Sequence, residues 1–249
     1  MSHFTVLVIG DNIEEQFAPY SEELEVDPYQ EDCWCRGSLA RKSASETASK
    51  TWDSKTHHSV WCKLYDEVLE KDQKPDPVCR ECYGTGSRST TYNPKSKWDW
   101  YTVGGRWLGF FKLKPDAEGV LGMPGAFKNK ASLDADQARK KDIDFETMER
   151  FHTFEAEQNW LKAQSEKDDT KFWLYDIKKD ETKEQYIKRN SRFSTFAVLK
   201  EGEWFEKGEM GWWGMVSNEQ DEDKWQEEFN KLVDSLPDDI LLTIVDCHI

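Results

Sequence analysis

Two strongly apolar segments, one at each end of the chain, dominate its hydrophobic pattern. Residues 4–9 and 240–249 are rich in Val, Ile and Leu, and such runs predict buried strands. Apolar residues recur at roughly helical spacing over 134–164 and again over 217–236, which predicts two helices. We therefore expect an α+β fold with an antiparallel or mixed sheet, helices on one face and a ferredoxin-like character, in which the sheet brings the two termini together.

Glycine-containing turns predict further strands inside the chain. Residues 97–113 read as two short strands joined at Gly104-Gly105, and residues 196–205 read as a hairpin that turns at Glu201-Gly202.

Composition divides the chain into a body and an insertion. Residues 1–32 and 91–249 are expected to form a single α+β domain, and residues 33–90 an inserted zinc-binding module. Within the insertion, residues 38–58 are rich in Ser, Thr and Lys, which predicts a mobile segment. Residues 60–70 read as a helix.

Four of the six cysteines form two close pairs in this insertion. A Cys-x-x-Cys turn followed by glycine can present two thiolates to one tetrahedral ion, so the pairs predict a structural zinc site. Buried thiols or a redox pair are the alternatives, and His57 or His58 could replace one ligand. The second pair, in the form Cys-x-x-Cys-x-Gly-x-Gly, resembles the zinc knuckles of DnaJ-type chaperones, whereas the first has one residue between its cysteines. The predicted ligands are Cys33, Cys35, Cys79 and Cys82.

Charge is unevenly distributed along the 249 residues, whose formal net charge is −15. Residues 1–32 carry nine acidic and no Lys or Arg side chains, whereas residues 33–130 carry 17 basic and 11 acidic ones. A uniformly acidic protein repels nucleic acid, but a basic middle segment is compatible with an anionic partner. The alternatives are an ordinary solvated surface and an acidic face that docks on a basic protein.

The segment from Trp98 to Trp107 is the strongest candidate for a ligand site. Arginine offers a planar fork for phosphate or carboxylate, tryptophan rings can stack on bases, and paired glycines allow a close backbone approach. The alternative is a core hairpin in which Arg106 pairs with a buried acid such as Asp99. The predicted ligand-binding residues are Trp98, Trp100, Gly104, Gly105, Arg106 and Trp107.

Histidines near both ends of the chain form a second candidate site. His3 and His248 would lie close together if the two end strands were antiparallel neighbours, and far apart if they were parallel. Asp11 and Asp246 might add a carboxylate near a strand end. This set would suit a hydrolytic or metal site, whereas the alternative is a set of partly exposed residues at strand ends.

Three stretches together suggest a family. They are residues 1–11 (MSHFTVLVIGD), residues 92–107 with NPKSKWDWY and GGRW, and residues 241–249 (LLTIVDCHI). The chain resembles, from end to end, a family of uncharacterised proteins encoded mainly by bacteriophages and prophages. The resemblance implies an origin rather than a chemistry, and it favours a protein that acts on the host or on nucleotides.

We therefore expect a zinc-stabilised binding protein that recognises a nucleotide or nucleic acid through an aromatic and arginine-bearing surface. An acidic inhibitor of a host defence protein and a nucleotide-processing enzyme are the alternatives. No apolar run approaches the roughly 20 residues that cross a bilayer, and the start lacks the features of a signal peptide. These observations predict a cytoplasmic protein with no membrane partner.

Overall fold

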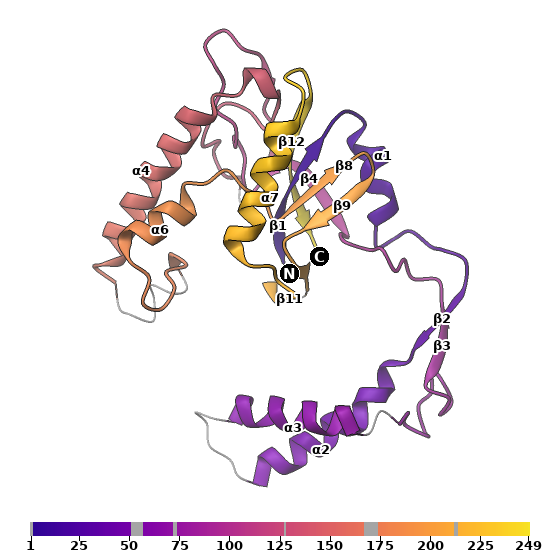
Figure 1. The fold of residues 1–249 in the computed structure, drawn as a ribbon. Helices are drawn as coiled ribbons and strands as arrows, with labels where there is room; N and C mark the ends of the chain where they lie inside the picture. The colour runs from indigo at the N-terminus through magenta and orange to yellow at the C-terminus, as the bar shows by residue number, and fades with distance from the viewer. Residues whose placement is uncertain (1, 51–56, 72–73, 127, 167–173, 212–213) are drawn as a thin grey trace. The chain divides into compact units, whose positions relative to one another are not determined.

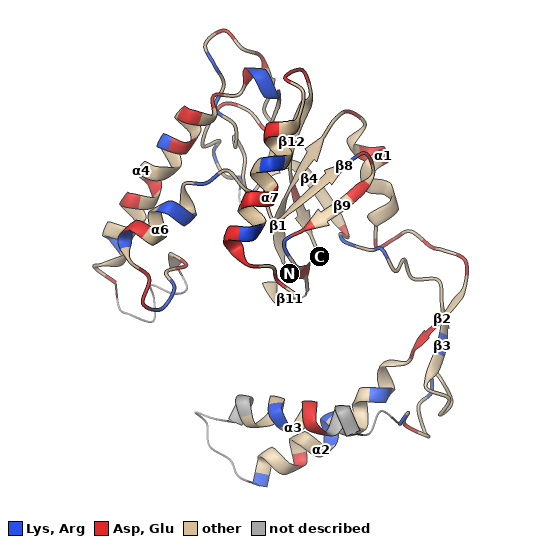
Figure 2. Cartoon of the chain, in the orientation of Figure 1, with Lys and Arg blue, Asp and Glu red and all other residues tan. Residues whose placement is uncertain are grey.

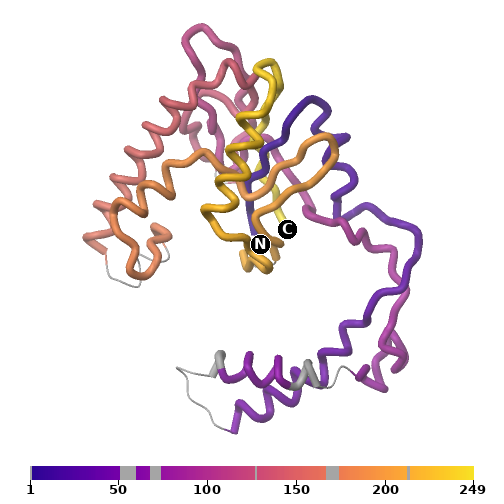
Figure 3. The backbone as a smooth tube through the Cα atoms, in the orientation of Figure 1, coloured from indigo at the N-terminus to yellow at the C-terminus, as the bar shows by residue number. Residues whose placement is uncertain are grey.

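The chain folds into two units in a computed structural model that describes residues 2–50, 57–71, 74–126, 128–166, 174–211 and 214–249. Met1–Leu24 and Pro94–Ile249 form one unit, called here the main unit, and Glu25–Asn93 form the other, called the cysteine unit. Figure 3 traces the chain out of the main unit after Leu24 and back into it at Pro94. Each unit is described by itself.

The main unit is built on a mixed β-sheet (Figure 1). Its elements, in chain order, are β1 (His3–Ile9), α1 (Ile13–Phe17), η1 (Ala18–Tyr20), β4 (Trp100–Gly105), β5 (Gly119–Val120), β6 (Met123–Pro124), β7 (Gln137–Arg139), η3 (Lys140–Asp142), α4 (Phe145–Ala163), α6 (Lys183–Asn190), β8 (Ala197–Lys200), β9 (Glu203–Glu206), β10 (Glu209–Met210), β11 (Val216–Ser217), α7 (Glu222–Ser235) and β12 (Leu241–His248).

The two end strands form the centre of the sheet. β1 pairs with β12 in antiparallel register, His3 opposite His248, and with β8 in parallel. On its other side β12 pairs with two strands in succession, β7 over Leu241–Thr243 and β4 over Val245–His248. The predicted strands at both ends are therefore confirmed, and so is the predicted meeting of the termini.

Two hydrophobic clusters cover opposite faces of the sheet, because alternate residues of β1 point to opposite sides. Leu7 and Ile9 belong to one cluster, which also holds the buried stripe of α7. Val6 and Val8 belong to the other, which holds Phe17 of α1. The α+β class and the mixed sheet are as predicted. However, α1 packs on the face opposite to α7, so the helices are not confined to one face, and a ferredoxin-like arrangement is not confirmed.

Several strands and helices differ from the boundaries predicted from local sequence patterns. Residues 97–113 do not form a hairpin, because β4 pairs with β12 and β6 instead. The predicted helix over 134–164 starts only at Phe145, where the Asp144 side chain accepts from the Thr147 amide and caps it. The hairpin at Glu201-Gly202 is confirmed, since β8 and β9 pair antiparallel and both turn residues have positive φ.

A buried carboxylate organises the point where β12 changes neighbours. Asp136 is fully buried, and its two oxygens accept from the backbone amides of Gly109 (2.8 Å), Phe110 (3.0 Å) and Gly122 (2.9 Å). Its backbone oxygen accepts from Ile244 of β12. The strand change leaves loop amides without ladder partners, and an ionised carboxylate satisfies several of them at once.

Asp136→Ala should therefore destabilise the main unit by about 3 kcal/mol or more, because three amides lose their acceptor. Urea unfolding followed by tryptophan fluorescence measures the loss. Asp134→Ala is the matched control, because the Asp134 side chain is exposed. A hydrogen bond from Lys112 holds the pKa of the Asp134 carboxyl below its usual value. We expect about 1 kcal/mol or less from the control. Equal losses in the two variants would contradict this role for Asp136.

The cysteine unit contains a short antiparallel ladder and two helices. Its elements are β2 (Tyr29–Asp32), η2 (Trp34–Gly37), α2 (Ser38–Lys50), α3 (His57–Lys71) and β3 (Ser87–Thr90).

The helices α2 and α3 pack on one another. Three alanines of α2 at four-residue spacing are buried, namely Ala40, Ala44 and Ala48. Small residues allow close approach of two helices, and the helix predicted over 60–70 is confirmed as α3. The mobile segment predicted over 38–58 is helical as far as Lys50, and residues 51–56 lie outside the described part of the chain. Among the described helices of the whole chain, none has the length and apolar character needed to cross a membrane.

Candidate functional site

The four paired cysteines form a buried cluster in the cysteine unit. Their sulfur atoms all lie within 4.8 Å of one another. The Sγ atoms of Cys33 and Cys79 are 3.7 Å apart, and those of Cys35 and Cys82 are 3.4 Å apart. All four side chains are buried. The cluster could hold a metal ion, and among the described residues it is the one group of metal-ligand side chains whose atoms come this close together.

Backbone contacts join the two cysteine turns. The amide of Cys33 donates to the carbonyl of Gly86 (2.9 Å), and the Arg36 guanidinium donates to the same carbonyl (2.9 Å). The amide of Gly86 in turn donates to the sulfur of Cys82 (3.3 Å). Gly84 and Gly86 have φ of 82° and 78°, which suits glycine. The glycines that follow Cys82 therefore shape the turn and stabilise a thiolate there.

The cysteine thiols differ in acidity. Burial raises the pKa of Cys35 to about 12. Burial acts in the same direction on Cys82, but amide donors from Gly86 and Gly84 outweigh it and lower the pKa of that thiol to about 6. Cys82 is thus the thiol best prepared to ionise, and a cation at the centre of the cluster would favour the thiolate form of all four.

The remaining candidate ligands of the cysteine unit lie elsewhere or outside the described side chains. His57 and His58 begin α3, but their side chains are not among those the structure describes. Cys62 also lies on α3 and is not a member of the cluster. In the main unit, Cys247 is fully buried in β12.

A second cluster, called here the histidine cluster, forms at the end of the main sheet and consists of His3, Asp99, Trp100, Asp246 and His248. His3 and His248 face each other across the β1–β12 ladder, and their ring centroids lie 5.0 Å apart. The antiparallel pairing on which the sequence hypothesis depended is therefore present. Asp246 joins the cluster as predicted, but Asp11 follows the other end of β1.

Each histidine of the cluster has a carboxylate at Nδ1. The Nδ1 atom of His3 lies 2.8 Å from Oδ1 of the fully buried Asp246, and Nδ1 of His248 lies 2.6 Å from Oδ1 of Asp99. The second oxygen of Asp246 accepts from the backbone amide of Arg106 (2.9 Å). The buried carboxylate therefore fixes the His3 ring and the glycine turn together.

The side chains of both histidines are largely buried, with 10% of His3 and 6% of His248 exposed. Neither Nε2 atom has a hydrogen-bond partner among the described residues, and neither is one of the fully buried polar atoms without a partner in that part of the chain. Each imidazole can accept or donate a proton through Nε2 where a ligand reaches it.

The predicted aromatic segment separates into exposed and core residues. Trp100 stacks on His248 with centroids 5.1 Å apart and is 40% exposed. Trp98 packs instead with Phe17, in the hydrophobic cluster on the face of the sheet that carries α1. Trp107 packs against the cluster on the opposite face, which holds the buried residues of α7. The alternative of a core role thus describes Trp98 and Trp107, whereas Trp100 lies beside the histidines.

Glycines 104 and 105 stand against buried carboxylates. A Cβ on Gly104 would lie 2.7 Å from Oδ2 of Asp136, and a Cβ on Gly105 would overlap the side chain of Asp246. Arg106 follows them and is exposed, and its guanidinium has no partner among the described residues. Asp99, the acid that the alternative interpretation assigned to Arg106, pairs with His248 instead. Trp212 and Trp213, a further aromatic pair in the sequence, lie outside the described residues.

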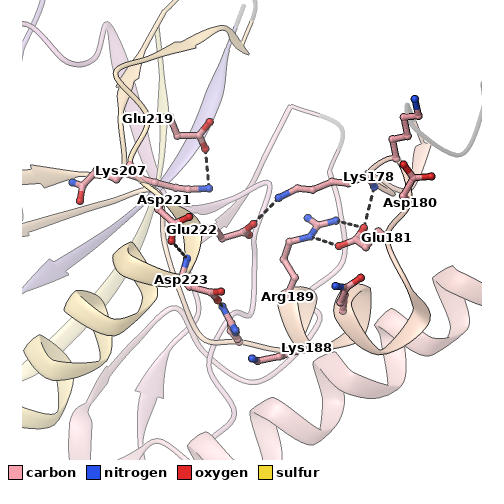
Figure 4. Close-up of a pocket in the computed structure, with 14 residues that line it drawn as sticks. Lys178, Asp180, Glu181, Lys188, Arg189, Lys207, Glu219, Asp221, Glu222 and Asp223 are labelled. Carbon is pink, nitrogen blue, oxygen red and sulfur yellow. Dashed lines mark hydrogen bonds and ion pairs between the residues drawn. The ribbon is translucent and has the colours of Figure 1, made fainter.

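A charged cleft of about 650 Å³ in the main unit was not predicted (Figure 4). Its lining comes from two segments, 178–192 and 207–223, which carry both signs of charge. The ion pairs Lys178–Glu222 (2.6 Å), Lys207–Glu219 (2.8 Å) and Arg192–Asp223 (2.8 Å) line it. Since these charges neutralise one another, the cleft has little net charge to offer a ligand. The clusters of Lys and Asp or Glu in the two segments were its only sequence signal.

No protein-family model, curated protein or solved structure matches the chain in the comparisons with known proteins.

Proposed function

We propose that the main unit binds a small phosphate-bearing ligand, a nucleotide or a short stretch of nucleic acid, beside the histidine cluster. The observation that carries the proposal is the exposed Arg106 guanidinium, which is unpaired among the described residues. The other arginines of the main unit have acidic or carbonyl partners: Arg139, Arg150, Arg189 and Arg192. A fixed turn with an unpaired guanidinium is suited to a planar anion such as phosphate.

The neighbouring residues support a nucleotide over a simple anion. Trp100 offers a partly exposed ring on which a base can stack. The imidazoles of His3 and His248 can donate from Nε2 to phosphate oxygens. A hydrogen-bonding and stacking site of this kind recognises a phosphate and a base together.

Overall charge favours a small ligand over long nucleic acid. The chain has a net charge of −15, which repels a polyanion at long range. Acidic residues outnumber basic ones on α4 and α7, and segments of both colours lie along the two helices (Figure 2), so these helices offer no continuous basic track. Lys97, a basic residue near Trp98, is paired with Glu206. Binding must therefore come from short-range contacts at the site.

We also infer that the cysteine cluster holds a structural zinc ion. Zinc–thiolate bonds of about 2.3 Å in a tetrahedron separate the sulfurs by about 3.8 Å. This is close to the 3.7 and 3.4 Å that separate sulfurs of opposite pairs, Cys33 from Cys79 and Cys35 from Cys82. Four thiolates leave no open position for water, so the ion would stabilise the fold and take no part in catalysis.

The resemblance to phage and prophage proteins supports two further inferences. We infer a phage origin, and with it a location in the host cytoplasm, where nucleotides and nucleic acids are available as ligands. The acidic-inhibitor alternative requires a continuous acidic face, and basic residues interrupt the acidic residues of both α4 and α7.

Arg106→Ala should weaken nucleotide binding by about 10-fold to 100-fold, because a charge-assisted hydrogen bond contributes about 1.5–3 kcal/mol. Quenching of tryptophan fluorescence by ribonucleoside 3′-monophosphates measures the affinity. Arg150→Ala is the matched control, since Arg150 is exposed on α4 and contacts Glu146 and Thr147 of the same helix at the surface.

Two results would reject the proposed function. Unchanged affinity in the Arg106 variant would remove Arg106 from the site. Failure of the unaltered protein to bind any of the four monophosphates would reject nucleotide binding itself and would favour the protein-inhibitor alternative.

A further inference from the structure

We propose that His3 and His248 are an acid–base pair that cleaves small ribose phosphodiesters by transfer of the phosphoryl group to the neighbouring 2′-hydroxyl. This inference rests on the proposed function, because it requires the phosphate to bind beside Arg106. It adds a reaction and a substrate class to that site.

The first support is the repeated carboxylate–imidazole arrangement. Asp246 and Asp99 come from different parts of the chain, yet each contacts Nδ1 of one histidine. A carboxylate at Nδ1 fixes the ring and places the reactive lone pair or proton on Nε2. A histidine that serves only to fill a strand end does not require this partner, and here both have one.

The second support is the way in which both carboxylates are themselves held. Asp246 accepts a backbone hydrogen bond from Arg106, and Asp99 accepts one from the amide of Trp100 (2.7 Å). The backbone amide of Asp99 also donates to the carbonyl of His248 (3.0 Å). The two positioning carboxylates are therefore fixed to the sheet, and the imidazoles are held in place before a ligand arrives.

The third support is the proximity of the two imidazole rings to each other and to the Arg106 turn. The ring centroids lie 5.0 Å apart, and neither Nε2 atom is a fully buried atom without a partner among the described residues. Adjacent imidazoles can contact different oxygens of one bound phosphate. Asp246 contacts both His3 and the backbone amide of Arg106, so two hydrogen bonds connect the Arg106 turn to His3. The Arg106 guanidinium can stabilise charge on the phosphate oxygens.

The described side chains favour proton transfer over a shared metal ion at this cluster. Each Nδ1 is already engaged by a carboxylate, and the cluster does not bring three ligand atoms close enough to share an ion. A histidine pair also supplies no nucleophile of its own to attack phosphorus. The substrate must therefore provide one, and the 2′-hydroxyl next to a 3′-phosphodiester is such a group.

The reaction balances as follows. One neutral imidazole takes the proton of the 2′-hydroxyl at Nε2, and the oxygen forms a bond to phosphorus. The bond from phosphorus to the 5′-oxygen breaks, and the other, protonated imidazole gives its Nε2 proton to that oxygen. The products are a 2′,3′-cyclic phosphate and a free 5′-hydroxyl. No electrons are transferred, and proton exchange with water restores the pair.

The test uses a mixed pool of ribodinucleotides with the full chain, and mass spectrometry to detect cyclic phosphates. We expect cleavage of the ribose pool and none of the matching deoxyribose pool. His3→Asn and His248→Asn should each lower the rate by about 100-fold or more. Asparagine can still donate to the carboxylate from the position of Nδ1, so these variants keep the local hydrogen bond and lose only the Nε2 function.

A substrate with a good leaving group separates the acid from the base. An aryl ester of a ribonucleoside 3′-phosphate expels its leaving group without a proton. We expect this ester to restore most of the rate in one asparagine variant, which identifies the acid, and not in the other. If the aryl ester restored the rate in neither variant, neither histidine would be the acid, and the acid–base pair would be overturned.

The controls keep the failure of this inference apart from failure of the proposed function. His152→Asn removes a histidine of α4 that lies beside Glu155 (3.7 Å) and should cleave normally. Monophosphate binding without cleavage of any ribodinucleotide would overturn the acid–base pair and leave the binding site intact. Full activity in both cluster variants, or cleavage of the deoxyribose pool, would also overturn it. Loss of monophosphate binding would reject the site as a whole.

Discussion

Cys79→Ser should release the zinc ion proposed for the cysteine cluster and unfold the cysteine turns while the main unit stays folded. Cys79 contributes one of four buried sulfurs and lies 3.7 Å from Cys33 on the other turn. A serine hydroxyl is not ionised at neutral pH and is a poor ligand for zinc beside three thiolates. In zinc-finger peptides the metal contributes about 10–16 kcal/mol, and this is folding free energy.

The expected loss is confined to the cysteine unit because that unit depends on few other buried side chains. Its cysteine turns are held by backbone bonds through Gly86 and by the short β2–β3 ladder. The main unit has its own two hydrophobic clusters. Native mass spectrometry should therefore show loss of one zinc, and limited proteolysis should cut residues 33–90 first.

Cys62→Ser is the matched control, since Cys62 lies on α3 outside the cluster. It should keep one zinc per chain and remain resistant to protease. Retention of zinc by the Cys79 variant would show that this sulfur is not a ligand. Simultaneous unfolding of both units would contradict their independence.

Elements with strong local signals were predicted well from the sequence. The apolar runs at 4–9 and 240–249 needed no knowledge of partners, because β-branched runs of that length favour buried strands. The turn at Glu201-Gly202 carries its own backbone preference. The cysteine ligands could be proposed for the same reason, since two close pairs with flanking glycines point to one ion.

Elements defined by distant partners were predicted poorly. The paired glycines at 104 and 105 suggested a hairpin, but they are glycines because Asp136 and Asp246 occupy the space of a side chain. Residues 137–139 fit a helical pattern and form β7, since β12 offers them a free edge. A strand partner that is about 100 residues away in the sequence is not indicated by the local pattern of residues.

The histidine cluster falls between these two cases. The sequence could name His3, His248 and Asp246, but their meeting depended on the direction of two strands. Asp99 was considered only as a partner for Arg106, and it pairs with His248 instead. Its role follows from backbone anchoring at the start of β4, which appears only once β4 is placed beside β12.

Gly105→Ala should be among the most damaging single substitutions in the main unit. Gly105 has φ of 57°, a conformation that an L-residue adopts at a cost of about 1–2 kcal/mol. A methyl group there would also overlap the Asp246 side chain, which is fully buried. Displacing that carboxylate would break its bonds to His3 and the Arg106 amide, at about 1–3 kcal/mol for each unsatisfied group. We expect a total loss of about 4 kcal/mol.

Gly202→Ala separates the backbone strain from the steric conflict. Gly202 has a similar positive φ, 77°, but no atom lies within 4 Å of where its Cβ would be. It should therefore lose only about 1 kcal/mol in urea unfolding. The difference in free energy of unfolding between the two variants measures how strongly the turn, the buried carboxylate and His3 depend on one another.

Because Asp246 positions His3, the Gly105 variant should also lose monophosphate binding at temperatures where it is still folded, whereas the Gly202 variant should bind normally. Equal losses of stability in the two variants would mean that Asp246 can move aside at no expense, and that it does not hold the turn and His3 together.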